Sequence, residues 1–152
     1  MAKRMVRRTR DGTFQLRISD DERDLVAGLA GQLRDLLLSD ETDGLKRLFP
    51  PGYANDPDRN AEYEILTHDE LLTKRLASVD VVEQTVSETS LDEDQITAWM
   101  GAINDLRLVL GTRLDVSEDM EDVAFDDPRA PAFAVYHYLT HLLGEIVLAL
   151  SD

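Results

Sequence analysis

Three side chains near the C-terminus have types and spacing that suit metal chemistry. His137, His141 and Glu145 follow one another at intervals of four residues, which places them on one face of a helix. Two imidazoles and a carboxylate can bind zinc or iron, so one hypothesis is a metal-binding enzyme or sensor. A complete site needs a further ligand from elsewhere in the chain. The candidates for that ligand are His68, Glu64 and Asp69.

A second interpretation needs no metal. The pattern is not the His-Glu-x-x-His motif of zinc peptidases. In this interpretation both histidines are interface or half-buried polar residues with local hydrogen bonds.

The chain has no cysteine, which excludes thiolate metal sites and cysteine catalysis. It also lacks a Gly-x-Ser-x-Gly motif and a glycine-rich phosphate loop. We therefore predict no cofactor and no catalytic residue, and we favour a protein that is not an enzyme.

An acidic segment precedes the last predicted helix. Residues 115–127 hold seven carboxylates, no basic residue and no glycine. A calcium-binding loop needs oxygen ligands at fixed positions and a central glycine. The segment is therefore expected to be a solvated loop.

The net charge of −15 is unevenly distributed along the chain. Residues 1–19, which we call the basic arm, hold six basic residues and one acidic residue, a net charge of +5, so residues 20–152 carry −20. Such an acidic body repels nucleic-acid phosphates, and DNA contact is expected through the arm alone. The arm could instead contact an acidic protein surface, pair with the body or face solvent. The candidate partner-binding residues are Lys3, Arg4, Arg7, Arg8 and Arg10 of the arm, with Phe49 and Tyr53 of a loop.

The arm has the pattern of a β-hairpin over residues 3–19. Phe14, Leu16 and Ile18 alternate with polar residues, which is typical of a half-buried strand. Asp11–Gly12 is a turn signal, because glycine accepts a positive φ. An isolated hairpin is marginally stable in water, so its apolar face is expected to pack on helices.

Two helices are expected in the first half of the remaining chain. Ser19 and Glu22 have the spacing of a capping box and open a helix that runs to about residue 38. Residues 39–57 predict a loop, because Pro50 and Pro51 cannot continue a helix. The second helix covers residues 58–88, and a break is possible near residues 67–69.

Two more helices are expected in the second half. Ser90 and Glu93 form a second capping-box pattern and open a helix to about residue 114. Asp127 can cap the last helix, with Pro128 at its first position, and that helix runs to about residue 150. Three glycines inside the predicted helices are expected to mark close helix–helix contacts. They are Gly101, Gly111 and Gly144.

Apolar side chains cover more than half of the last predicted helix. It should therefore be the central, most buried helix or part of a dimer interface. A membrane span is disfavoured because His137, His141 and Glu145 would be costly inside a bilayer. The basic N-terminus is not followed by the apolar segment of a secretory signal. We expect a cytoplasmic protein.

These elements predict a mainly all-α fold: a four-helix bundle-like domain with an N-terminal β-hairpin. A chain of 152 residues suits a single domain. Within it, residues 1–19 form the basic arm and residues 20–152 the helical body.

Three segments carry a resemblance to a known family. They read LFPPGY from Leu48, WMGAINDLRLVLGTRL from Trp99 and YHYLT from Tyr136. The chain resembles an actinobacterial family catalogued as a domain of unknown function, whose members include the AosR-type oxidative-stress transcriptional regulators. The resemblance implies a small, cytoplasmic, mostly helical protein without established catalysis, often encoded near the ClpS adaptor of the Clp protease. It also implies redox regulation through a cysteine pair and a transcription partner, but this chain has no cysteine.

The leading hypothesis is a non-enzymatic regulatory or protein-interaction domain. It would be a stress-linked transcriptional regulator that acts through a protein partner in the transcription machinery, and it would form a homodimer. Because the chain has no cysteine, the signal to which it responds must differ from thiol oxidation. The two alternatives are the metal-binding enzyme or sensor and direct DNA binding through the arm.

Overall fold

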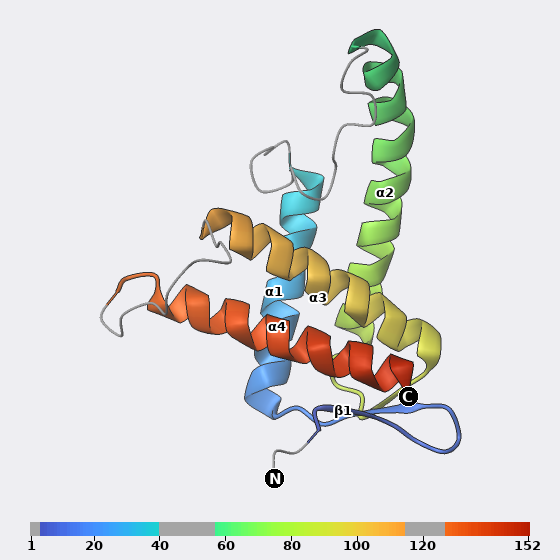
Figure 1. The fold of residues 1–152 in the computed structure, drawn as a ribbon, viewed down its shortest axis with the longest axis vertical. Helices are drawn as coiled ribbons and strands as arrows, with labels where there is room; N and C mark the ends of the chain where they lie inside the picture. Colours follow the sequence, from blue (N-terminus) through green and yellow to red (C-terminus); the bar gives the residue numbers. More distant parts are fainter. Residues whose placement is uncertain (1–3, 40–56, 115–126) are drawn as a thin grey trace.

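The computed structural model describes residues 4–39, 57–114 and 127–152, and for residues 57–68 it describes the helix without its side chains (Figure 1). The mainly α prediction with an N-terminal hairpin is confirmed. In chain order the elements are β1 (Val6–Arg8), β2 (Phe14–Leu16), α1 (Asp20–Leu38), α2 (Pro57–Thr85), β3 (Ser90–Leu91), α3 (Glu93–Arg113) and α4 (Ala130–Ser151).

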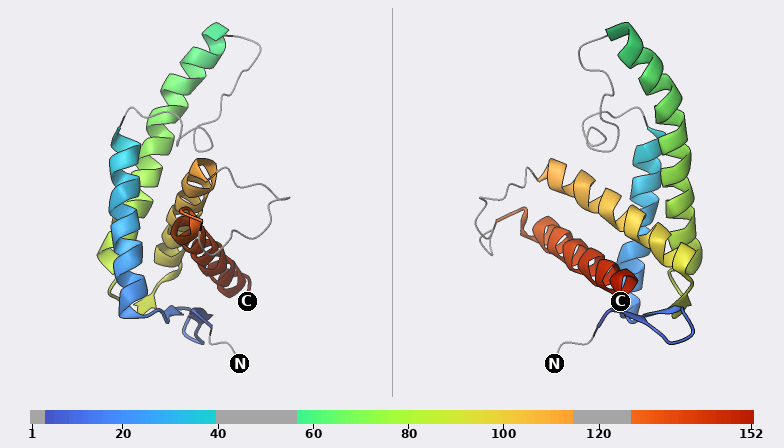
Figure 2. Two further views of the ribbon diagram at one scale, coloured as in Figure 1. Left: turned by 90° about the vertical axis from the view of Figure 1, so that its left-hand side faces the viewer. Right: turned by 45° about the vertical axis from the view of Figure 1, so that its right-hand side comes forward.

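The four helices form two layers. Helices α1 and α2 lie along one another, and α3 and α4, also side by side, cross them (Figures 1 and 2). The hairpin lies at one end of the molecule, beside the C-terminal end of α4. Helix α2 is continuous through residues 67–69 and ends at Thr85 rather than near residue 88.

The hairpin turn has the predicted glycine geometry. The amide of Gly12, whose φ is +86°, donates to the Thr9 carbonyl at 3.2 Å, and the Thr9 amide donates to the Thr13 carbonyl at 2.8 Å. The sequence did not predict the third strand. β3 pairs antiparallel with β2, with Leu91 opposite Phe14 and Ser90 opposite Gln15.

The first capping box is confirmed, and the second was placed two residues too early. The Ser19 hydroxyl accepts from the Glu22 amide at 3.1 Å. At α3 the box is formed by Asp92 and Gln95, with bonds of 2.8 and 2.9 Å. Ser90 cannot cap this helix because it belongs to β3, whose Leu91 is buried beneath the sheet. Asp is as good an N-cap as Ser, so the local pattern did not distinguish the two.

The predicted cap of the last helix was also wrong. α4 begins at Ala130, two residues after Pro128. The Asp127 carboxylate accepts from the Arg129 amide at 2.8 Å and pairs with its guanidinium at 3.1 Å. Asp127 therefore forms a turn before the helix instead of capping it.

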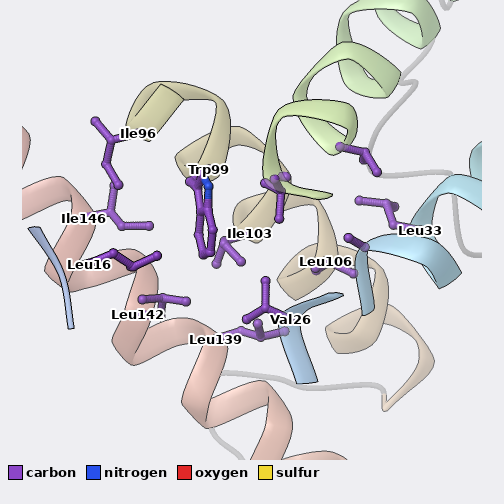
Figure 3. Packing of buried hydrophobic residues seen from close by; sticks show 14 of the residues in the cluster. Leu16, Val26, Leu33, Ile96, Trp99, Ile103, Leu106, Leu139, Leu142 and Ile146 are labelled. Carbon is purple, nitrogen blue, oxygen red and sulfur yellow. The ribbon is translucent and has the colours of Figure 1, made fainter. Parts of the chain in front are cut away.

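Helix α3, not α4, is the central helix, because it contacts α1, α2 and α4. Trp99 of α3 is fully buried where Leu16, Leu142 and Ile146 converge (Figure 3). Its indole nitrogen donates to the Thr85 hydroxyl at 2.8 Å, which satisfies the one polar group of the ring.

Helix α4 is buried on one face and exposed on the other. It packs against α3 and β1, while Val147 and Leu148 are 45% and 56% exposed. Within the described ranges it is the one helix long and apolar enough to cross a membrane by length and composition, and 33% of that stretch is buried. Its expected central position is thus corrected, because apolar content alone does not say which element covers a helix.

The glycines inside the helices do not share one role. A Cβ on Gly111 would lie 3.1 Å from the Tyr136 ring of α4, so this position marks the expected close contact. A Cβ on Gly101 would lie 3.7 Å from the Ser78 hydroxyl, which is ordinary contact. Nothing lies within 4 Å of a Cβ on Gly144, so the expectation was wrong there.

A buried ion pair joins α2 to α3. Asp105 is 3% exposed, and its carboxylate accepts a hydrogen bond from the Arg75 guanidinium. Burial raises the pKa of Asp105, and the hydrogen bond and charge of Arg75 oppose that rise. The carboxylate would be costly here without its partner.

We predict that Arg75→Leu lowers the free energy of unfolding by about 3 kcal/mol, because it leaves a buried carboxylate unpaired. The double variant Arg75→Leu/Asp105→Leu should recover most of that loss. Urea unfolding of the wild type, of Arg75→Leu and Asp105→Leu alone, and of the double variant measures both effects. Equal free energies of unfolding for Arg75→Leu and for the double variant would contradict the role given to the pair.

Candidate interaction surface on the N-terminal hairpin

The basic arm is fastened to α4 through Glu145. This carboxylate is 8% exposed. One oxygen accepts from the Met5 amide at 3.2 Å, and the other lies 3.0 Å from Nε of Arg4. A buried carboxylate needs such partners, so the contact fixes where the arm begins.

Arg8 makes a second attachment at the end of α4. Its guanidinium donates to the Asp152 carbonyl at 2.6 Å and lies 5.1 Å from the centre of the Phe14 ring. Nη2 of Arg4 lies 4.0 Å from the Asp152 carboxylate. Cations are favourable at the C-terminal end of a helix. Arg4 and Arg8 therefore point toward the body.

The remaining arginines of the hairpin point outward. Successive side chains of a strand alternate between its faces, so Arg7 is exposed while Val6 and Arg8 face inward. Arg10 lies exposed in the turn, and the exposed Arg17 donates to the Gln15 side chain at 2.9 Å. The arm thus has an anchored face, with Arg4 and Arg8, and an outward face that we call the free cationic face, with Arg7 and Arg10.

A shallow, open hollow of about 450 Å³ lies on the hairpin. Its lining is mostly polar and consists of Thr9, Asp11, Thr13, Gln15, Leu16, Arg17, Thr89 and Ser90. The hydroxyls of Thr9 and Thr13 donate to the Asp11 carboxylate and lower the pKa of Asp11 to about 2. These groups can hydrogen-bond to a polar ligand or a peptide. With its low pKa, the Asp11 carboxylate is a weak base toward the threonine hydroxyls.

The other sequence candidates are not among the described residues of this surface. Lys3, Phe49 and Tyr53 fall outside the described residues, as do the side chains of Glu64 and His68. Asp69 is exposed on α2.

The proposed metal ligands of α4 do not converge. His137 and His141 are exposed, whereas Glu145 is buried and both its oxygens contact the arm. In the part of the chain with described side chains, no three metal-ligating groups lie together.

Arg23, which was not predicted as a functional residue, positions the sheet. Its guanidinium donates to the carbonyls of Val86 and Glu88, both at 2.7 Å, and of Leu16 at 3.0 Å. It therefore ties α1 to β2 and to the connection before β3. The sequence did contain a signal for this role. Arg23 follows three acidic residues at the start of α1, where a positive charge is unfavourable with the helix dipole, so its position suggests another partner.

We predict that Arg4→Ala lowers the free energy of unfolding by about 1–3 kcal/mol, because it leaves an oxygen of Glu145 buried without its cation. Arg7→Ala removes an equally charged neighbour that faces solvent, and its effect should stay within about 0.5 kcal/mol. Urea unfolding compares the two variants. Equal losses would show that Arg4 is not an anchor.

We predict that the Asp11 carboxyl titrates at about pH 2 in the folded protein, well below the ~3.9 of an unfolded chain. The folded state therefore gains stability from Asp11 above about pH 4, and loses it as the pH falls toward 2. Carbonyl NMR gives the midpoint directly. Thr9→Ala should raise it, whereas a wild-type midpoint near 3.9 would refute the hydrogen-bonded turn.

Comparison with known proteins places the chain in a family. Residues 3–150 match the family described as "Domain of unknown function (DUF2017)". The oxidative stress regulator AosR of Mycobacterium tuberculosis (strain ATCC 25618 / H37Rv) is 30% identical, over 93% of this chain and 84% of that protein. The putative oxidative stress regulator AosR of Mycobacterium leprae (strain TN) is 32% identical, over 86% of this chain and 67% of the relative. No solved structure matches significantly. The predicted resemblance is thus confirmed, and the chain belongs to the DUF2017 family.

Proposed function

We propose that this protein is a non-enzymatic, stress-linked regulator that acts in the cytoplasm through a protein partner of the transcription machinery. Its similarity to proteins named oxidative stress regulators supports the regulatory role. The structure supports a role without catalysis, because Asp105 and Asp11, two carboxyls with shifted pKa values, serve an ion pair and a turn.

The free cationic face of the hairpin is the proposed contact. The observation that carries this proposal is the division of the arm: Arg4 and Arg8 hold it to α4, while Arg7 and Arg10 face solvent. A cationic face on a held hairpin suits an acidic protein surface, because little conformational freedom is lost on binding. Lys3, Phe49 and Tyr53, named from the sequence, remain candidate contacts.

The input must be something other than a thiol. These 152 residues contain no cysteine, so a disulfide switch cannot form within them. A regulated partner, or a change in the amount of this protein, can still link it to stress.

Affinity capture from the native cytoplasm, followed by mass spectrometry, tests the proposal. The wild-type protein should enrich RNA polymerase or a sigma factor, and Arg7→Ala/Arg10→Ala should reduce that enrichment about tenfold or more. The charge control is Arg113→Ala/Arg129→Ala, which removes the same charge from exposed positions near the ends of α3 and α4, although Arg129 also pairs with Asp127.

Two results would contradict the proposal. Unchanged capture by the hairpin variant would exclude the cationic face as the contact. Enrichment of DNA alone, with a steep salt dependence that Arg7→Ala/Arg10→Ala removes, would instead favour direct DNA binding through the arm.

A further inference from the structure

The exposed face of α4 carries no Asp, Glu, Lys or Arg side chain. Its residues recur at alternating intervals of three and four, and every one of them is exposed. We call this set the α4 face, and it consists of Ala134, His137, His141, Gly144, Leu148 and Ser151, with Thr140 and Val147 beside it. The single charged side chain of α4, Glu145, is buried against the arm and absent from this face.

No other helix of the described structure has such a face. The exposed side chains of helices α1, α2 and α3 include carboxylates, among them Asp24 and Asp35 on α1, Asp69 and Glu70 on α2, and Glu93 and Asp94 on α3. Large exposed hydrophobic side chains are also concentrated on α4. Of the three in the described residues, Val147 and Leu148 lie here and Leu38 lies at the end of α1.

We propose that the α4 face is a self-association surface, on which the α4 helix of a second copy packs antiparallel. The distribution of charge on the chain favours a second copy as the partner of this face. Two chains of net charge −15 repel one another, and their helices can meet without opposing carboxylates only where both faces are uncharged. A cationic partner, by contrast, would be attracted to the acidic faces of α1 and α2.

The residue order favours the antiparallel arrangement. Spacing of three and four residues is that of a left-handed coiled-coil seam. About a two-fold axis between His141 and Gly144, each His141 faces the small Gly144 of the other copy, where nothing fills the space of a Cβ.

Parallel packing would be worse on two counts. It would place the two glycines opposite one another and leave a gap. It would also bring together the two basic arms, which lie at the C-terminal ends of the α4 helices. Antiparallel packing separates the arms and opposes the helix dipoles favourably.

Analytical ultracentrifugation of the full chain tests the surface. The wild type should sediment as a dimer of twice the 17.1 kDa chain mass. Leu148→Glu should weaken the dimer about 100-fold, because a two-fold interface loses the contact twice. Leu38→Glu is the matched control, since Leu38 is a leucine of similar exposure on α1, and it should leave the dimer unchanged.

A cysteine cross-link tests the same surface without weakening it. Because the chain has no cysteine, His141→Cys introduces a single thiol next to the proposed axis, and mild oxidation should yield a covalent dimer at micromolar concentration. Gln32→Cys, exposed on α1, should not. This variant decides the question if Leu148→Glu fails to fold, which circular dichroism shows.

Three outcomes would overturn the proposal. They are a wild type that stays monomeric at high concentration, a dimer that Leu148→Glu and Leu38→Glu affect equally, and a monomer that binds lipid vesicles through α4. None of them bears on partner capture by the hairpin, so this inference can fail while the proposed function holds.

Discussion

The buried carboxylate of Glu145 is the constraint around which this molecule is organised. A carboxylate that is 8% exposed requires a compensating cation and a hydrogen-bond donor, and the arm supplies both through Arg4 and the Met5 amide. Because these partners lie 140 residues apart in sequence, one contact joins the first strand to the last helix. The buried side chains of Val6, Phe14 and Leu16 then set which face of the hairpin points inward.

The same contact separates two functional hypotheses that the sequence left open. Glu145 stood in a possible metal triad, and Arg4 in a possible partner-binding set. The structure brings these two residues together, which engages the carboxylate and turns Arg4 inward. The free cationic face is left to Arg7 and Arg10, and the exposed face of α4 is left without charge.

Local signals predicted the elements better than their assembly. Gly12 and the Ser19–Glu22 pair make short-range contacts, so their sequence patterns were sufficient. β3 was missed because two residues have no periodicity, and they form a strand only where β2 passes beside them. The Arg75–Asp105 pair and the Arg23 contacts join segments distant in sequence, so no local pattern could have assigned their partners.

The candidate site was predicted as a set of residues but not as a geometry. The basic arm was visible in the charge distribution, and strand alternation alone implies that neighbouring arginines face opposite ways. The apolar residues Phe14, Leu16 and Ile18 showed which face packs on the body. The sequence could not show that Arg4 and Arg8 on the arm would meet Glu145 and the C-terminal end of α4. Likewise, apolar composition identified α4 as a packing helix but did not show that one of its faces stays exposed.

Hydrogen exchange at the Met5 amide tests most directly whether the arm belongs to the folded body. This amide lies outside β1 and donates to Glu145, so its protection depends on that contact. The account predicts exchange slowed about 100-fold or more relative to an unstructured chain. Exchange at the unstructured rate, with the amides of α3 still protected, would show that the arm is not held to α4.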